Sequence, residues 1–435
     1  MLKLAHGVKD YFRVTQDCKP LPAVYVYDTY YNKWVGGFYY GIAIKITNLL
    51  ASQCRNEFDA KKYGKALKTA ELYTLLADFV PRELRVVKGE ALYWQAAILK
   101  TVGDFYGALP LFEQAEKVFF DTSFRRPVDA FAFANQFGMV YLQFGDFDSA
   151  EKKFQRVLKV APENPAVPHE FIASAHSGMG AVYRLQKEPD KAVVEYKKAL
   201  EMYLALKGDF RVSLATCAQA LASVYGDGGH YQEAEAFYRQ AEDMWKQLPD
   251  KELNLARLKS EMGNTEFQKK DYEKAIIYLK EALELFRGSD ANLWDWIGNM
   301  NLLGMAFDKK GEKKEAVNVF ENLIDDEDFK EAPDALRLSS LMNLAQLYLD
   351  TKYYAQAVLV FGDILTILSE QKENNPDSYL QIQIKIAQAY LAMRDTKNLQ
   401  IITKEINAFS KGKKLLPETA KRLAEVTPIL KESEL

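Results

Sequence analysis

The sequence predicts an all-α solenoid, in which pairs of helices stack one after another around a continuous core. An alanine recurs every 41 or 42 residues through most of the 435-residue chain, and a period of that size is typical of solenoids. On both sides of a short turn near each alanine, apolar residues repeat at the spacing of amphipathic helices. The recurring positions are Ala66, Ala108, Ala150, Ala192, Ala234, Ala275, Ala316 and Ala357, with Leu399 in register at the end.

Residues 137–162 show the repeated unit most clearly. Gly138 lies on the first predicted helix, Gly145 opens the turn, and Ala150 and Phe154 line the second predicted helix one turn apart. A small residue on the first helix allows the two helices to approach closely, and an aromatic ring fills the space beside it. The small residues at this position include Gly138, Gly180, Gly263 and Gly304.

This pattern of small and aromatic residues around a turn resembles the tetratricopeptide repeat (TPR). The family's usual repeat has 34 residues, and the present one is longer by about eight, or roughly one extra turn per helix. In this respect the chain is similar to kinesin light chain, to the LGN class of polarity adaptors and to the Rap-type peptide-sensing regulators. Further copies contain Gly180, Tyr183, Ala192, Tyr196 and Ala199; Ala222, Tyr225, Ala234 and Tyr238; Gly304, Phe307, Ala316 and Phe320; and Ala345, Tyr348, Ala357 and Phe361.

The resemblance implies a right-handed superhelix of about nine helix–turn–helix repeats over residues 37–410. Residues 1–36 are then an aromatic-rich N-terminal extension, in which residues 24–27 predict a short strand and Asn32 and Lys33 a turn. Two interpretations of this extension stay open: a cap on the first repeat, or a segment that binds a partner or the protein's own groove. Residues 411–435 are expected to form a C-terminal capping helix, with Ala420 and Leu423 on one side.

The composition gives no sign of a nucleic-acid or membrane surface, because 57 Lys and Arg residues nearly balance 60 Asp and Glu residues. The three cysteines, Cys18, Cys54 and Cys217, are far apart and form no disulfide framework, which favours a reducing compartment. The first residues lack the apolar core of a signal peptide, and no apolar run is long enough to span a bilayer. We therefore expect a soluble, cytoplasmic protein with no nucleic-acid or membrane partner.

No combination of residues predicts catalysis, a metal or a cofactor. His169 and His176 are seven residues apart rather than four as in HExxH, which separates them by about 10 Å along a helix. The acidic run at residues 325–333 lacks the alternating ligands and central glycine of a calcium loop, so we interpret it as a solvated linker. We expect a protein that is not an enzyme and that uses no small-molecule cofactor.

The resemblance places possible partner contacts on the first helix of each repeat, at positions that face the concave groove. Amide and hydroxyl side chains there can bond both the N–H and the C=O groups of an extended peptide. The alternative is that these are ordinary solvated positions. The predicted groove residues are Asn135, Ser177, Arg184, Arg257, Ser260, Asn264, Asn301, Asn343, Gln346 and Gln388.

The carboxylate clamp of chaperone-binding TPR domains requires paired Lys, Asn and Arg residues on three successive first helices. The equivalent positions here hold Asn135, Ser177 and Gln219, together with Met139, Ala181 and Ser223, so the clamp is absent. The sequence thus predicts a non-enzymatic interaction scaffold that binds a peptide or a partner helix in its concave groove. Alternatives are a Rap-type peptide-sensing regulator and an architectural subunit of a larger complex that uses its convex face.

Overall fold

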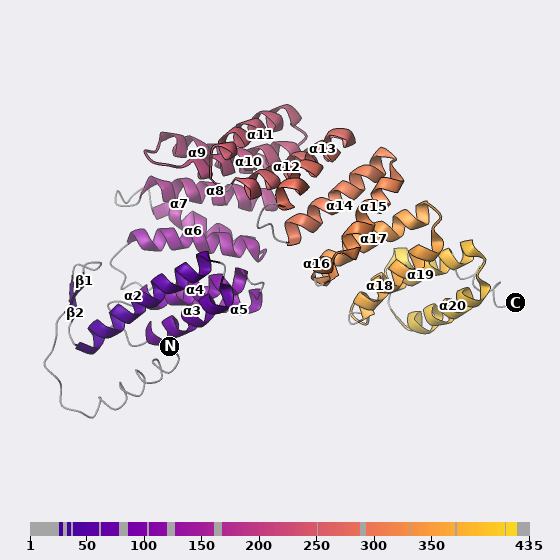
Figure 1. Cartoon of the computed structure of the whole chain (residues 1–435), viewed down its shortest axis with the longest axis horizontal. Coiled ribbons are helices and arrows are strands. Elements are labelled where there is room, and N and C mark those ends of the chain that lie inside the picture. Colours follow the sequence, from indigo (N-terminus) through magenta and orange to yellow (C-terminus); the bar gives the residue numbers. More distant parts are fainter. Residues whose placement is uncertain are drawn as a thin grey trace, which may run out of the picture. The chain divides into compact units, whose positions relative to one another are not determined.

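The structure is a computed structural model that describes residues 26–28, 33–35, 38–60, 62–77, 86–101, 104–119, 127–160, 168–249, 251–287, 293–330, 332–369, 372–413 and 415–423. Within these ranges the helices follow one another as nine pairs (Figure 1). The pairs are α2 (Phe38–Asp59) and α3 (Tyr63–Ala77); α4 (Val86–Thr101) and α5 (Phe105–Phe119); α6 (Pro127–Gln143) and α7 (Phe147–Val160); α8 (His169–Leu185) and α9 (Pro189–Ala205); α10 (Arg211–Asp227) and α11 (Tyr231–Lys246); α12 (Glu252–Gln268) and α13 (Tyr272–Arg287); α14 (Leu293–Lys310) and α15 (Lys313–Asp325); α17 (Asp334–Asp350) and α18 (Tyr354–Leu368); and α19 (Pro376–Met393) and α20 (Thr396–Ser410). The all-α prediction is confirmed.

The recurring position on the second helix is buried in every pair. All eight alanines are 0% exposed and Leu399 is 2% exposed. In each pair its backbone N–H donates to the carbonyl four residues earlier, just before the second helix, as Ala150 does to Asp146 and Ala316 to Glu312. The recurring residue therefore sits where the chain re-enters a helix after the turn, and this repeated geometry is what keeps the period constant.

A small residue on the first helix lies against the recurring aromatic or apolar side chain of its own pair. A Cβ atom added to Gly304 would lie 2.4 Å from the ring of Phe320, which is itself fully buried. In the first pair Cys54 takes the small position, and its Sγ donates to the carbonyl oxygen of Ala66 at 3.7 Å. The predicted close approach of the two helices is thus confirmed.

Where the turn inside a pair is described in full, which is the case in the last seven pairs, it contains one residue in the left-handed backbone region. A positive φ reverses the chain tightly enough for the second helix to fold back on the first, and glycine adopts it without steric cost. Four of the seven pairs nevertheless place a basic residue there. These turn residues are Gly145, Lys187, Gly229, Lys270, Gly311, Lys352 and Arg394. We call the small residue, the turn residue, the recurring residue and the side chain four positions later the packing seam of a pair.

The internal contacts divide the chain into two compact units, residues 1–208 and 209–435, which we describe separately. In the first unit α2 packs on α4, and α6 on α8. In the second unit α10 packs on α12, α12 on α14, and α14 on α17. Successive first helices thus form a wall within each unit. The predicted division into residues 1–36, 37–410 and 411–435 stays a prediction.

The described part of the N-terminal extension is a two-stranded antiparallel hairpin. Strand β1 (Val26–Asp28) pairs with β2 (Lys33–Val35), with Tyr27 opposite Trp34. The predicted strand at residues 24–27 overlaps β1, whereas β2 was not predicted. Lys33 belongs to β2 and pairs with Asp28, so it does not lie in the predicted turn. Asn32, the other residue of that prediction, lies outside the described residues.

The acidic run at residues 325–333 is not the solvated linker that the sequence suggested. It contains a short helix, α16 (Glu327–Lys330), in which Phe329 is only 2% exposed and joins the hydrophobic core. The carboxylate of Asp326 accepts a hydrogen bond from the Phe329 backbone N–H at 3.3 Å. The charged residues of this run therefore flank a buried aromatic residue, which the composition of the run did not indicate.

Residues 417–423 form a helix that packs against α19, in the region predicted for the C-terminal cap. Its buried residue is Thr419, whose hydroxyl accepts a hydrogen bond from the Gln381 amide at 3.1 Å. Leu423 packs against the core, whereas Ala420 is exposed. The helix therefore turns Thr419 and Leu423 toward α19 and the core.

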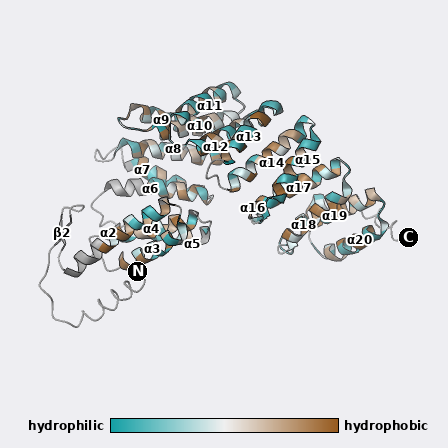
Figure 2. Cartoon of the chain, viewed as in Figure 1, coloured by the Kyte–Doolittle hydropathy of each residue, from teal (hydrophilic) through white to brown (hydrophobic). Residues whose placement is uncertain are grey.

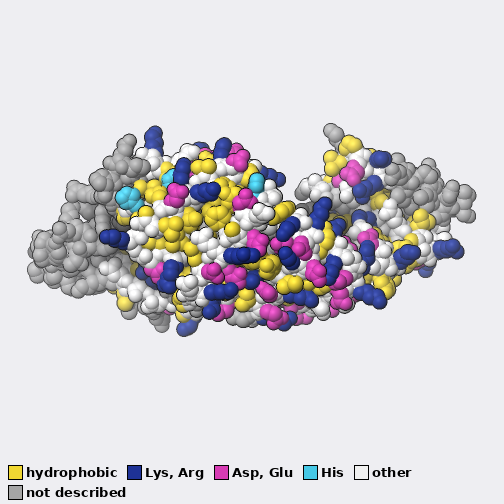
Figure 3. Space-filling view, turned by 90° about the horizontal axis from the view of Figure 1, so that it is seen from above, with side chains coloured by type: hydrophobic (Ala, Val, Ile, Leu, Met, Phe, Trp, Pro, Cys, Tyr) yellow, Lys and Arg dark blue, Asp and Glu magenta, His cyan; other side chains and the backbone are white. Residues whose placement is uncertain are grey.

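The helices are amphipathic, and Figure 2 shows hydrophobic and hydrophilic residues alternating along them. In the face drawn in Figure 3, Lys and Arg side chains are interspersed with Asp and Glu, and hydrophobic side chains lie between them. None of the described helices combines the length and the apolar character that a membrane crossing requires.

Candidate functional site

All ten groove residues predicted from the sequence lie on the first helices of their pairs. Three belong to the first unit and seven to the second. Their role in binding stays a prediction, but the burial and hydrogen bonds of five of them show three different environments. By helix they are Asn135 on α6; Ser177 and Arg184 on α8; Arg257, Ser260 and Asn264 on α12; Asn301 on α14; Asn343 and Gln346 on α17; and Gln388 on α19.

Two of the predicted asparagines are buried between neighbouring first helices. Asn135 is 5% exposed, and its Nδ2 donates to the carbonyl oxygen of Phe171 on α8 at 2.8 Å. Asn301 is 9% exposed, and its Nδ2 donates to Ser339 on α17 at 3.3 Å. These amides hold one first helix to the next, so the expectation of an open, partner-facing surface does not hold for them.

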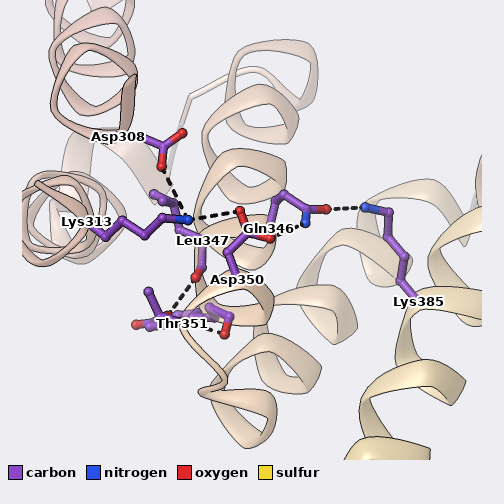
Figure 4. Close-up of polar contacts among 8 residues, drawn as sticks. Asp308, Lys313, Gln346, Leu347, Asp350, Thr351 and Lys385 are labelled. Carbon is purple, nitrogen blue, oxygen red and sulfur yellow. Dashed lines mark hydrogen bonds and ion pairs between the residues drawn. The ribbon is translucent and has the colours of Figure 1, made fainter. Parts of the chain in front are cut away.

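Two further predicted residues are exposed but already have partners within the protein. Arg257 places its Nε 2.8 Å and its Nη2 2.7 Å from Oδ2 of Asp295 on α14, which joins two first helices by an ion pair. Gln346 donates to Asp350 at 2.9 Å and accepts from Nζ of Lys385 at 2.6 Å (Figure 4). A partner that used these groups would compete with the contacts that they already make.

Arg184 differs from the others, because its guanidinium makes no hydrogen bond or ion pair within the described part of the chain. It lies on the last turn of α8, half-buried, at the edge of a pocket of about 240 Å³ in the first unit. The pocket opens between α6 and α8, and Tyr196 of α9 contributes to its lining. The remaining lining residues are Met139, Leu142, Gln143, Ala181 and Leu185.

The pocket is almost entirely apolar, and two of its side chains are unusually exposed for their type. Met139 is 48% and Leu185 is 46% exposed. A large apolar side chain placed in the pocket would remove both from water, a gain of about 25 cal/mol for each Å² of apolar surface buried. Arg184 offers a planar set of donors that matches a carboxylate in two-point geometry. The arrangement is suited to an apolar side chain that lies next to an acidic group.

The sequence predicted Arg184 but missed the pocket beside it. Met139 and Ala181 occupy positions where the carboxylate clamp would have polar residues, and the sequence was interpreted only as lacking that clamp. Both residues face the same space between α6 and α8. Two uncharged residues at one helical position in successive repeats were the available signal, because side chains 42 residues apart meet on adjacent first helices.

Of the two histidines on α8, His176 takes part in an ordinary polar contact. Nδ1 of His176 lies 2.6 Å from Oε2 of Glu195 on α9, and Lys198 donates to the other oxygen of that carboxylate at 2.8 Å. Burial tends to raise the pKa of Glu195, but the hydrogen bonds from Lys198 and His176 outweigh it and lower that pKa. Among the described residues, no group of three or more His, Cys, Asp or Glu side chains could hold a metal ion.

Comparison with known proteins bears on this architecture directly. Sequence profiles of the tetratricopeptide repeat match residues 135–205, 171–247 and 255–288. The chain contains tetratricopeptide repeats. These matches cover the helix pairs α6–α7 to α12–α13, in which the packing seams were already recognised from the sequence.

A curated relative is the Arabidopsis thaliana Protein KINESIN LIGHT CHAIN-RELATED 2, which is 23% identical over 216 residues. That alignment covers 48% of this TPR chain, which spans about a third (32%) of the relative's length. Among solved structures, the apo form of RapI matches 88% of this chain and 99% of its own, with 14% identity and a TM-score of 0.51. The apo form of the quorum sensor NprR from B. thuringiensis matches 83% and 98%, with 15% identity and a TM-score of 0.49. The likeness to RapI shows a shared fold, and the TPR family assignment makes this chain a repeat scaffold for protein interactions.

Proposed function

We propose that this TPR chain is a non-enzymatic scaffold that holds a peptide or a partner helix against the concave wall of its first helices. The observation that carries the proposal is the apolar pocket between α6 and α8 with Arg184 at its edge. An arginine that is half out of water and lacks an internal partner retains its capacity to bind a carboxylate. The neighbouring apolar pocket adds selectivity for the side chain beside that carboxylate.

The proposed binding mode requires little rearrangement of the wall. The two helices that line the pocket, α6 and α8, pack directly on each other, and the buried Asn135 ties them through the Phe171 carbonyl at 2.8 Å. A surface that is already fixed loses little conformational entropy when a partner binds. We further propose a cytoplasmic location, which agrees with the two buried cysteines of the described chain, Cys54 and Cys217, which form no disulfide with each other.

A second candidate is an architectural subunit that uses its second helices, and one observation favours it. Three second helices of the second unit carry an exposed apolar residue two positions after the recurring one. Leu359 on α18 is 72% exposed, Ile277 on α13 is 52% exposed and Ile401 on α20 is 49% exposed. Exposed apolar side chains repeated in register are typical of a contact surface rather than of a solvated helix face.

Site-specific photo-crosslinking in cells distinguishes the two candidates. A benzophenone amino acid is placed at Leu185 in one variant and at Leu359 in another, and crosslinked partners are identified by mass spectrometry. We expect a crosslink from Leu185 that disappears with Arg184→Glu and persists with Lys159→Glu. Lys159 is an exposed residue on α7, so it controls for the change of charge.

Two crosslinking results would contradict the proposal. A partner captured from Leu359 and not from Leu185 would move the functional surface to the second helices. A Leu185 crosslink that Arg184→Glu leaves intact would remove the arginine from the binding site. The Rap-type regulator remains the other alternative from the sequence, and it requires that a short peptide, rather than a protein, is the molecule captured at Leu185.

A further inference from the structure

The second unit contains a lysine whose charge is not neutralised by a direct ion pair. Lys385 lies on α19, half-buried, with its Nζ 2.6 Å from the amide oxygen of Gln346 and 5.8 Å from the centre of the Phe361 ring. It makes no ion pair with a carboxylate of the described residues, unlike Lys313 and Lys413 in the same unit. An ammonium group has three donors, and only one of them is used here.

The network drawn in Figure 4 explains why no internal carboxylate reaches Lys385. Asp350, a carboxylate whose charge acts on Lys385, receives Nζ of Lys313 at 3.3 Å on one oxygen and the Gln346 amide at 2.9 Å on the other. Lys313 is in turn 3.8 Å from Asp308. Gln346 therefore stands between Asp350 and Lys385, and it presents a neutral oxygen to the lysine in place of a charged one.

A second cation, Arg422, belongs to the helix that packs against α19. The Gln381 amide bonds Thr419 at 3.1 Å, and this fixes the helix of residues 417–423 against α19. Lys385 is one turn beyond Gln381, and Arg422 is nearly one turn beyond Thr419. Burial, followed by the charge of Arg422, lowers the pKa of Lys385, whereas the charge of Asp350 opposes this effect. The guanidinium of Arg422 is 46% exposed and uses its Nη2 on Glu418 at 2.7 Å, so further donors remain.

We propose that Lys385 and Arg422 form an anion-binding subsite on the first-helix wall of the last repeat, and that it receives a carboxylate from an acidic segment of a partner protein. Such a group would accept from the unused donors of both cations and would relieve the repulsion between them. The exposed amide of Gln388, one turn beyond Lys385 on α19, would flank the bound segment.

The charges around the subsite favour a carboxylate over a phosphoryl group. Asp350 on α17 and Glu418 beside Arg422 carry negative charge close to the two cations. A single negative charge balances Lys385, whereas a phosphoryl group with nearly two charges would be repelled by both carboxylates. This site is separate in sequence and in unit from the Arg184 pocket, so the two can be tested independently.

The subsite can be tested on the full chain with three fluorescent peptides that differ only in charge: a tetraglutamate, its phosphoserine counterpart and a tetraglutamine. Binding is followed by fluorescence anisotropy at low and at physiological salt. We expect the tetraglutamate to bind more tightly than the other two, and to weaken as salt rises. Lys385→Gln and Arg422→Gln should each weaken it about tenfold, as expected for the loss of one charge-assisted contact.

Lys404→Gln serves as the matched control, because Lys404 is an exposed lysine on the second helix of the same pair. A lysine-acetylation footprint read by mass spectrometry localises the peptide, and tetraglutamate should protect Lys385 but not Lys404. Circular dichroism melting shows whether each variant stays folded, and Arg422→Gln keeps the test valid if Lys385→Gln does not. Equal losses in the control, tighter binding of the phosphopeptide, or no protection of Lys385 would each overturn the proposal.

Discussion

The packing seams and the predicted groove positions on the first helices differ in how uniform their surroundings are from pair to pair. In the seam the recurring residue is fully buried in eight pairs and 2% exposed in the ninth, and the residue four positions later is aromatic or apolar in most of them. On the first helices the residues that the sequence grouped together include a buried amide, an ion-paired arginine and an arginine without an internal partner. One set is uniform in environment, and the other is not.

The difference arises from what surrounds each position. A seam residue packs against the small residue of its own pair, as Phe320 does against Gly304, and the helix–turn–helix geometry is the same each time. The environment of a first-helix residue is set by the neighbouring pair, whose side chains differ from repeat to repeat. The same helical position is therefore occupied by Asn135, buried against α8, by Ser260 on α12, and by Asn301, bonded to Ser339.

The largest expected effect comes from the seam. Phe320→Ala removes a fully buried ring that fills the space beside Gly304, and it should lower the free energy of unfolding by about 3–5 kcal/mol. Guanidinium titration followed by circular dichroism measures the loss. Leu359→Ala is the matched control on the neighbouring second helix, and at 72% exposure it should change stability by less than about 0.5 kcal/mol. Equal losses in the two variants would contradict the assignment of the seam.

Much of the fold could be predicted because the seam repeats. Eight alanines in phase indicated the number of pairs, and Gly138, Gly180, Gly263 and Gly304 indicated where the helices approach. The features that were missed do not repeat. Strand β2 and the helix around Phe329 each occur once in the described chain, and single aromatic residues in charged or aromatic-rich segments give no period to detect.

The next effect separates two asparagines that the sequence could not distinguish. Asn135→Ala should lower the free energy of unfolding by about 0.5–1.5 kcal/mol, because it removes the 2.8 Å hydrogen bond by which the buried Asn135 amide ties α6 to the Phe171 carbonyl of α8. Asn264→Ala, at a half-buried position on α12, should cost less than about 0.5 kcal/mol. Thermal denaturation of both variants provides the comparison. If Asn264→Ala is the more damaging change, then the division of the first-helix residues by burial is wrong.

The candidate site was less predictable than the fold for the same reason. Placing these residues on first helices required only the period, whereas deciding which of them lack partners required the identity of residues about 38 positions away. Arg257 is engaged because Asp295 lies opposite it, and Arg184 has no such residue in the described chain. Sequence periodicity contains the first kind of information and not the second.

The smallest effect concerns the turn residue of the seam, which is glycine in some pairs and basic in others. Gly229 and Lys270 occupy the same turn position in successive pairs, with φ of 77° and 67°. A residue with a side chain in this backbone region costs about 1–2 kcal/mol. A change to glycine removes that cost, but part of the stabilisation is lost because glycine has more conformational freedom in the unfolded chain. Lys270→Gly should therefore stabilise the protein by about 0.5–1 kcal/mol, whereas Gly229→Ala should destabilise it by about 1 kcal/mol.

Lys270→Ala separates the two causes, since it removes the long side chain but keeps the Cβ atom, and it should leave the melting temperature nearly unchanged. If Lys270→Ala stabilises the protein as much as Lys270→Gly does, then the lysine side chain, and not the backbone conformation, is the unfavourable element in this turn.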